Sequence, residues 1–411
     1  GTYTAEMTSN EVNPPLILQG DANFIGSITN IVLLEITNDT NLPRINYEGF
    51  SYDGNGDIIP DSGCGSWLLE PQSTNYGLNS EQPSTWHSSG GTTITPNATT
   101  SPEGLQNSSL VVNNASSGNR YARNLFNFPS GSGLQTVTVS YFIKYYNNQW
   151  VRLKSVFFNG SPANNVSTWF DIQNGVVGTV GANHTAKIED YSNGWYRCSI
   201  TFDIDKSVDP NGYVHIEAMD GDNSNTYAAN GKGFYAYGSQ GEEQSYATSY
   251  IPTSGASSTR LRDIATDSGN STLINSTEGV LYAEFSTNNT DGSNWLNISD
   301  TTAVNWLFLG KQGGYIRVYL RANNSVIFDY TKPLEDKNKI ALSYKSGDIK
   351  VYINGVNVGN STNTFSFTSA LSRIDFNQYN GGGTQTQIAW KALAVYKEAL
   401  TDAELTALTT I

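Results

Sequence analysis

The sequence predicts an all-β protein: two antiparallel β-sandwich domains of jelly-roll type in tandem, a short β-rich N-terminal region and one C-terminal helix. Charged residues make up only 15% of the 411 residues, and the polarity comes from Asn, Ser, Thr and Gly. This composition favours short strands and turns over long helices. Short runs alternate between apolar and polar residues with no helical pattern between them, which is typical of a β-sandwich.

The N-terminal region, residues 1–62, is predicted to stand apart from the two sandwiches. Its runs "PLILQG" and "ITNIVLLEIT" predict strands, but the region is too short and too poor in apolar residues to form its own core. We therefore expect an attachment or oligomerisation segment. The chain starts with neither an initiator methionine nor a signal-peptide pattern, so we expect a fragment or a processed product.

The first sandwich is predicted over residues 63–262. Strict alternation in "GWYRCSITFDI" places four side chains on one buried face, namely Tyr196, Cys198, Ile200 and Phe202. The chain has two cysteines, Cys64 and Cys198, which is too few for a disulfide scaffold. Two semi-buried thiols and one long-range disulfide are both compatible with the sequence.

The second sandwich is predicted over residues 263–411. The segment "KSGDIKVYINGVNVG" contains two tight-hairpin signals, Ser346-Gly347-Asp348 and Asn354-Gly355, because such turns require positive φ. The closing segment "LTDAELTAL" changes character. Thr401 followed three residues later by Glu404 is a capping box, and Leu405 and Leu408 then share one face of a short helix.

Several phrases resemble a recurrent architecture of phage tail-fibre and virion proteins and of related bacterial surface proteins. They are "NLPRINY", "GSWLLEPQSTN", "TSPEGLQNSSLV", "NGWYRCSITF", "YGSQGEEQSYATSYIPT", "TRLRD", "EGVLYAEF", "VYINGV" and "VYKEALTDAELTAL". The resemblance implies a carbohydrate-binding-module-like jelly roll followed by a laminin-G or concanavalin-A-like domain, with a role in glycan or surface recognition. It supplies no catalytic residues. We expect "SYATSYIPT" (245–253) to form the last strand of the first sandwich and "SGASST" (254–259) a short flexible joint.

The acidic balance of the chain limits its partners. The formal net charge is −14, which repels nucleic acid and anionic membranes but tolerates neutral sugars or a cationic partner. No apolar run reaches the roughly 20 residues that span a bilayer. We therefore expect neither a nucleic-acid partner nor membrane insertion.

Aromatic residues beside polar turns are the candidates for sugar binding, because a pyranose ring stacks its C–H face on an aromatic ring. In "STWFDIQNG", Phe170 and Ile172 face the core, so Trp169 points to the opposite face. The complete candidate set is Tyr146, Trp150, Arg152, Trp169, Trp295 and Trp306. Trp195 and Trp67 lie inside the family phrases and are expected in the core.

Calcium is the ion that the sequence suits best, because Ca²⁺ takes several oxygen ligands from carboxylates, amides and carbonyls. The candidate ligands lie in two loops and are Asp53, Asn55, Asp57, Asp220 and Asp222. The first loop lacks the glycine and the final glutamate of an EF-hand. A solvated turn is the competing interpretation for each loop, and an ion there would be structural.

Catalytic patterns are weak. Glu217 and Asp220 have the wrong spacing for paired carboxylates on one strand face, and the partners expected of a lyase around "YFIKYYN" are missing. We therefore predict a non-enzymatic recognition protein on a virion surface, a tail or head fibre, assembled as a homotrimer with other virion proteins and bound to a host-surface polysaccharide. The alternatives are a depolymerase or lyase, a structural spacer or decoration domain, and a secreted or cell-surface bacterial adhesin.

Overall fold

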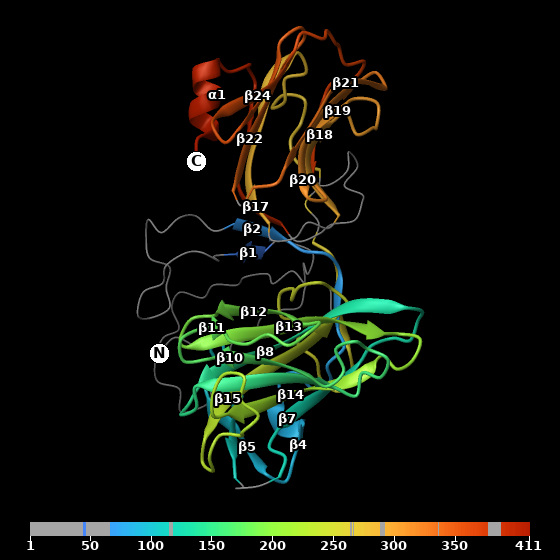
Figure 1. Cartoon of the computed structure of the whole chain (residues 1–411). Helices are drawn as coiled ribbons and strands as arrows, with labels where there is room; N and C mark the ends of the chain where they lie inside the picture. Colours follow the sequence, from blue (N-terminus) through green and yellow to red (C-terminus); the bar gives the residue numbers. More distant parts are fainter. Residues whose placement is uncertain are drawn as a thin grey trace, which may run out of the picture. The chain divides into compact units, whose positions relative to one another are not determined.

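The computed structural model describes residues 44–46, 66–114, 118–263, 265, 267–287, 292–335, 337–376 and 388–411. In this part of the chain almost all regular structure is β, with one helix near the C-terminus, which confirms the predicted fold class (Figure 1). Of residues 1–62 only β1 (Arg44–Asn46) is described, so the other predictions for that region lie outside the described residues. No helix among the described residues is long and apolar enough to cross a membrane.

The first sandwich has two antiparallel sheets of six strands each, which we call the β8 sheet and the β9 sheet after central strands. The β8 sheet has the order β12 (Thr185–Asp190), β13 (Trp195–Asp205), β8 (Leu134–Tyr145), β15 (Gly233–Glu242), β6 (Ser108–Asn113), β5 (Thr92–Thr99). The β9 sheet has the order β11 (Val176–Val177), β10 (Val166–Asp171), β9 (Trp150–Val156), β14 (Asn211–Met219), β7 (Ala122–Asn127), β4 (His87–Ser88). A 3-10 turn, η1 (Pro83–Thr85), precedes β4.

The core of the first sandwich lies between these sheets and follows the predicted alternation. Cys198, Ile200 and Phe202 are buried in it, and Tyr196 packs at its margin. The Tyr141 hydroxyl of the β8 sheet donates to the Val214 carbonyl of the β9 sheet at 2.9 Å, which satisfies a buried polar group across the core. Cys198 is a free thiol with no exposed surface, and burial raises its pKa; Cys64 lies outside the described residues.

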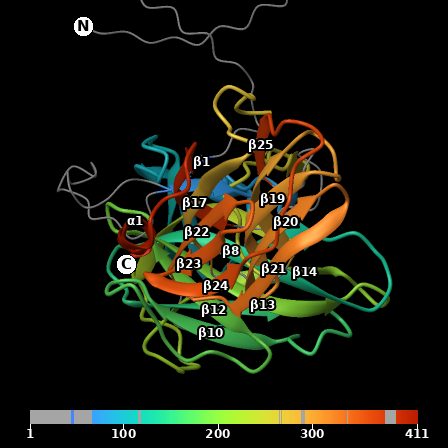
Figure 2. The same ribbon diagram turned by 90° about the horizontal axis from the view of Figure 1, so that it is seen from above.

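The C-terminal sandwich also has two antiparallel sheets, the β22 sheet and the β19 sheet (Figure 2). The β22 sheet has the order β1, β2 (Ser66–Leu69), β26 (Ile388–Tyr396), β17 (Glu278–Ser286), β22 (Asn338–Lys345), β23 (Ile349–Ile353), β24 (Val356–Ser361). The β19 sheet has the order β21 (Ser325–Pro333), β20 (Tyr315–Ala322), β19 (Trp306–Gln312), β18 (Ser293–Ser299), β25 (Arg373–Phe376).

The local signals of this sandwich are found where the sequence predicts them. The β23–β24 hairpin turns at Asn354 (φ 50°) and Gly355 (φ 80°), both in the left-handed region that a tight hairpin needs. The helix α1 (Asp402–Thr409) starts with the predicted capping box of Thr401 and Glu404. Its Leu405 is fully buried against the β22 sheet.

Strand β2 precedes the first sandwich in sequence but hydrogen-bonds to β26 of the β22 sheet. Residues 66–69 fall within the range 63–262 that the sequence assigns to the first domain, yet Leu69 is buried in the core of the C-terminal sandwich. Directly after it, β3 (Ser73–Asn75) pairs with β16 (Ser258–Arg260) in a two-stranded sheet. The segment that leads into the first sandwich is therefore hydrogen-bonded to the segment that leads out of it.

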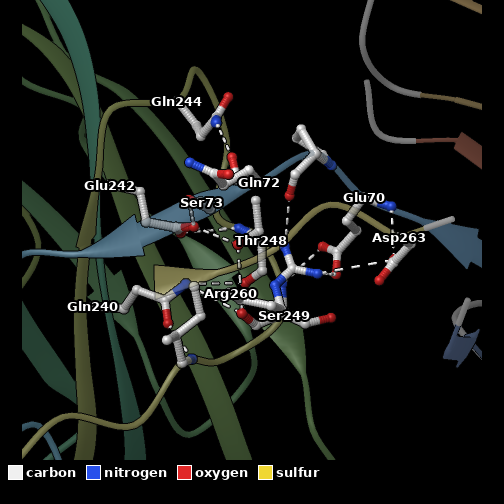
Figure 3. Close-up of polar contacts among 12 residues, drawn as sticks. Glu70, Gln72, Ser73, Gln240, Glu242, Gln244, Thr248, Ser249, Arg260 and Asp263 are labelled. Atoms are coloured by element: carbon white, nitrogen blue, oxygen red, sulfur yellow. Dashed lines mark hydrogen bonds and ion pairs between the residues drawn. The ribbon is translucent and has the colours of Figure 1, made fainter. Parts of the chain in front are cut away.

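A buried ion pair lies beside this two-stranded sheet (Figure 3). The Glu70 carboxylate, with no exposed surface, accepts hydrogen bonds from Arg260 Nη1 at 2.9 Å and from the Ser249 amide at 2.8 Å. The Asp263 carboxylate, also fully buried, accepts from the Glu70 amide at 2.9 Å. Arg260 therefore neutralises buried acidic charge contributed by both segments.

The "SYATSYIPT" segment is ordered but is not a strand, because β15 ends at Glu242 and no strand follows until β16. Its backbone is held by hydrogen bonds to side chains and not by pairing with a neighbouring strand. Arg197 Nη1 donates to the Thr248 carbonyl at 2.6 Å, and Gln240 Oε1 accepts from the Ile251 amide at 2.6 Å. The buried Glu242 carboxylate accepts from Ser73 and from Thr248 (Figure 3). The predicted joint, 254–259, contains the first residues of β16.

We expect Arg260→Met to lower the free energy of unfolding by about 3–5 kcal/mol, because it leaves buried carboxylates without their cation. Urea denaturation of the full chain measures it. Arg317→Met is the matched control: Arg317 pairs with Asp329 at 2.7 Å, but both side chains are partly exposed, so we expect a loss below about 1 kcal/mol. Equal losses in the two variants would contradict this assignment.

A second buried polar group makes stability depend on pH. His184 lies between Ser155 and Thr168, with 3.0 Å from Nε2 to the Ser155 hydroxyl and 3.0 Å from Nδ1 to the Thr168 hydroxyl. Burial lowers the pKa of His184 from 6.5 to about 4. The folded protein therefore holds a neutral imidazole over a pH range in which the unfolded chain binds a proton.

The sign follows from linkage: this stability is fully present above pH 6.5 and is lost as the pH falls toward about 4. We expect wild type to lose about 3 kcal/mol more than His184→Gln between pH 7 and pH 4. Glutamine keeps a donor and an acceptor but does not titrate. Denaturant unfolding at both pH values measures the difference, and parallel losses would show that His184 is not responsible.

Candidate functional site

The outer face of the β9 sheet, on the side away from the core, carries charged and aromatic side chains in two neighbouring ladder rows. Ladder partners point to the same face of a sheet, and one ladder row joins His87, Arg123, His215 and Lys154 across β4, β7, β14 and β9. The neighbouring row joins Glu217, Arg152 and Trp169. The intervening residues of these strands, such as Val151 and Ile216, face the core.

A buried ion pair forms the centre of this face. The Glu217 carboxylate, 2% exposed, accepts from Arg152 Nε at 2.5 Å and lies 3.4 Å from His215 Nδ1. Burial opposes ionisation of Glu217, but the hydrogen bond from His215 and the charge of Arg152 outweigh it, so its pKa is lowered. Burial likewise lowers the pKa of His215. A neutral His215 that donates from Nδ1 to an ionised Glu217 agrees with the lowered pKa of both groups. We call Glu217, Arg152 and His215 the Glu217 network.

A second cluster surrounds Arg123, and we call Arg123, Tyr121, Tyr213 and Phe157 the Arg123 cage. The guanidinium carbon lies 3.8 Å from the ring centre of Tyr213, 5.1 Å from that of Tyr121 and 5.6 Å from that of Phe157. These distances are in the range of cation–π contacts. Arg123 Nη1 lies 3.3 Å from His215 Nε2, which links the Arg123 cage to the Glu217 network.

Phe157 is the most exposed member of the Arg123 cage. It follows β9, is 56% exposed, and has a φ of 66°, in the left-handed region that bulky residues avoid. Its neighbour Phe158 is fully buried in the core. The unfavourable backbone places one aromatic ring inside and the next one outside, and such strain is concentrated at functional sites in proteins.

The loop between β14 and β15 covers one end of the face. Trp169 Nε1 donates to the Ser224 carbonyl at 3.1 Å, and Arg152 Nη1 donates to Asn225 Oδ1 at 3.1 Å. Asp222 fastens the loop to the β10–β12 region by accepting from the Thr179 amide at 2.8 Å and from its hydroxyl at 3.0 Å. Trp169 therefore lies on the outer face, as alternation predicts, but only 6% of it is exposed.

The structure brings together three of the six carbohydrate-binding candidates. Trp150, Arg152 and Trp169 share the outer face of the β9 sheet, with the Arg152 guanidinium 5.7 Å from the Trp169 ring centre. Arg152 donates to the Glu217 carboxylate and is only 6% exposed, so it holds its neighbours in place and is not available to a ligand. Tyr146 lies apart from them: it is 43% exposed, and its ring packs on Tyr235 of the β8 sheet at 5.4 Å.

The other two candidates lie on the outer face of the β19 sheet. Trp295 and Trp306 belong to an aromatic cluster with Phe308 and Tyr319, in which Trp295 stacks on Phe308 at 4.5 Å. Trp306 is 9% exposed and Phe308 only 1%. These rings contact one another more than solvent, and little of Trp306 is left to face a sugar.

Of the two loops predicted to bind calcium, only the second lies among the described residues. Asp53, Asn55 and Asp57 lie outside the described residues. Asp222 uses both carboxylate oxygens on Thr179, and Asp220 is exposed. Across the described ranges, no group of three His, Cys, Asp or Glu residues is placed to hold a metal ion. Structural calcium therefore stays a prediction.

Sequence reasoning missed the Arg123 cage. Arg123 belongs to β7 and Tyr213 to β14, whereas Tyr121 lies just before β7 and Phe157 just after β9. Only the non-local register places Arg123 opposite His215. Two local signals were present. In "NRYARN", Tyr121 and Arg123 share a face by alternation, and the consecutive aromatics Phe157 and Phe158 cannot both face the core of a strand.

Comparison with known proteins gives similarity at the level of partial folds. No protein-family model and no curated protein matches the chain. Among solved structures, the Ruminococcus gnavus IT-sialidase CBM40 is 17% identical, with a TM-score of 0.30, over 36% of this chain and 95% of that one. Domain 4 of AbnA, a GH43 extracellular arabinanase from Geobacillus stearothermophilus, is 22% identical with a TM-score of 0.28, over 38% and 73%. A SAP-like pentraxin from Limulus polyphemus is 16% identical with a TM-score of 0.29, over 35% and 74%.

We expect Arg152→Met to destabilise the fold by about 3–5 kcal/mol, since it leaves Glu217 as an uncompensated buried charge. The double variant Arg152→Met, Glu217→Leu removes both charges and should recover most of the loss. Urea unfolding of the two single variants and the double variant gives the coupling energy. If the losses simply add, Arg152 and Glu217 do not stabilise each other.

Proposed function

We propose that this chain is a non-catalytic recognition protein, a fibre or surface segment of a phage virion, that binds a host-surface glycan through the outer face of the β9 sheet. The observation that carries the proposal is Phe157, an exposed ring held by an unfavourable backbone beside the Arg123 guanidinium. A folded chain gains no core packing from such a ring, so a ligand contact is the simplest reason to hold it there.

The chemistry of the Arg123 cage suits a sugar. A pyranose presents an apolar C–H face that stacks on an aromatic ring, and Phe157 offers most of its surface. The hydroxyls of Tyr121 and Tyr213 and the remaining N–H groups of Arg123 can meet sugar hydroxyls around that ring. The Glu217 network underneath fixes the position of Arg123 through His215.

An enzymatic role, as a depolymerase or lyase, is the first rival, and the His215–Glu217 pair is the feature that favours it. A histidine oriented by a buried carboxylate is the arrangement of a general base. However, the Nε2 lone pair that would take the proton already faces Arg123 at 3.3 Å. Tyr121 also stacks over the His215 ring at 4.0 Å. Both contacts argue for a supporting role.

Assembly and location belong to the same proposal. We place the chain in a homotrimeric tail or head fibre with other virion proteins, or, as the alternative, in a secreted or cell-surface bacterial adhesin. A spacer or decoration domain is the remaining rival. Sedimentation of the full chain tests the trimer. Host-cell binding by the full chain separates recognition from a spacer, since a spacer would leave cells and glycan arrays unlabelled.

We expect Phe157→Ala to weaken glycan binding about five- to tenfold, because an aromatic contact of this kind contributes about 1 kcal/mol. Titration of the sugar identified on a glycan array measures the change. Leu134→Ala is the matched control, since Leu134 is 60% exposed but belongs to the β8 sheet. Unchanged affinity in Phe157→Ala would place the glycan elsewhere. Release of reducing ends or unsaturated products from the bound polysaccharide would overturn the non-catalytic assignment.

A further inference from the structure

Arg123 differs from Arg152, the other arginine on the strands of the β9 sheet, in having no acidic partner among the described residues. Its hydrogen bond goes to His215 Nε2, which is neutral when Nδ1 donates to Glu217. Its Nε is buried without a hydrogen-bond partner. A guanidinium has five N–H donors in a fork that matches a carboxylate or sulfate group, so most of this donor capacity is unused.

Lys154 adds a second uncompensated charge on the same row. It is the ladder partner of His215 on the side opposite Arg123, and among the described residues no carboxylate lies within ion-pair distance of it. Two strand spacings separate the backbones of Arg123 and Lys154, about 10 Å. Glu217, the acidic residue of these two rows, is already neutralised by Arg152. These two ladder rows therefore carry a net positive charge in a chain of net charge −14, and the nearest further carboxylate on this face, Asp171, lies in the next row beside Trp150.

We infer that the Arg123 cage takes an acidic sugar, whose carboxylate or sulfate group binds Arg123 and Lys154 while its ring stacks on Phe157. This inference rests on the proposed function and narrows it to one class of glycan. Charge-assisted bonds from a guanidinium to such groups are about twice as strong as neutral hydrogen bonds. An anion at Arg123 would accept from the Nη donors that His215 leaves unused.

The overall charge of the protein decides which acidic ligands fit. A long polyanion passes over the acidic remainder of the surface and is repelled there. A single acidic residue in or at the end of a glycan lies within a Debye length of Arg123, about 8 Å at physiological ionic strength, and is attracted. We therefore expect recognition of a sparsely charged glycan rather than binding to heparin-like or nucleic-acid polymers.

The test compares matched acidic and neutral probes by titration on the full chain: sialyllactose against lactose, trigalacturonate against its carboxyl-reduced form, and a sulfated lactose against lactose. We expect an acidic member to bind at least tenfold more tightly than its neutral partner, and the preferred pair distinguishes carboxylate from sulfate. Arg123→Gln should remove this preference and leave the weaker neutral affinity. Lys187→Gln, a matched charge loss on the β8 sheet, should change nothing.

Two further variants keep the result interpretable. Arg123→Lys retains the charge without the fork and should keep part of the preference, which a mere loss of folding would not allow. Phe157→Ala should weaken acidic and neutral probes equally. If wild type binds the acidic and neutral members equally, the inference fails while the proposed function stands. If no probe binds at millimolar concentration and glycan arrays are blank, both fail.

Discussion

The ion pair of Glu70 with Arg260 is the interaction on which the described architecture depends most. Glu70 precedes the first sandwich and Arg260 follows it, 190 residues later in the chain. Removing a carboxylate from water is unfavourable by several kcal/mol unless a cation and further donors meet it. Arg260 and the amide of Ser249 meet it here, and the two-stranded sheet of β3 and β16 continues the contact. The pairing of β2 with β26 then ties the leading segment to the C-terminal sandwich.

A second buried ion pair between a carboxylate and an arginine, Glu217 with Arg152, lies on the outer face of the β9 sheet and has a different consequence. Glu217 neutralises Arg152 and fixes His215, and His215 in turn contacts Arg123. Arg152 and Trp169 are buried below the 220–227 loop and act as support. Phe157 lies outside this support and is 56% exposed, and Arg123 beside it is partly exposed. The face thus divides into residues that hold it in place and residues that a ligand can contact.

The net charge of the chain and the charge of the two ladder rows around His215 and Glu217 have opposite signs, and the proposed selectivity depends on both. A net charge of −14 discourages indiscriminate contact with polyanions. Arg123 and Lys154 form a local exception on one ladder row. Composition alone was compatible with neutral sugars or a cationic partner, because a sum over the chain contains no information about which side chains share a surface.

The sequence by itself determined the elements whose signals are local. Alternation gave the sandwich strands and the inward set of Cys198, Ile200 and Phe202, and Asn354-Gly355 and the capping box of Thr401 gave a hairpin and a helix. It also placed Trp169 on the outward face. Only the tertiary structure decided that "SYATSYIPT" is held by side chains rather than by a ladder, that β2 joins β26, and that Arg123 meets Tyr213 and Phe157. The physical reason is that turns and caps depend on neighbouring residues, whereas strand partners and buried charge pairs depend on register between segments up to about 190 residues apart.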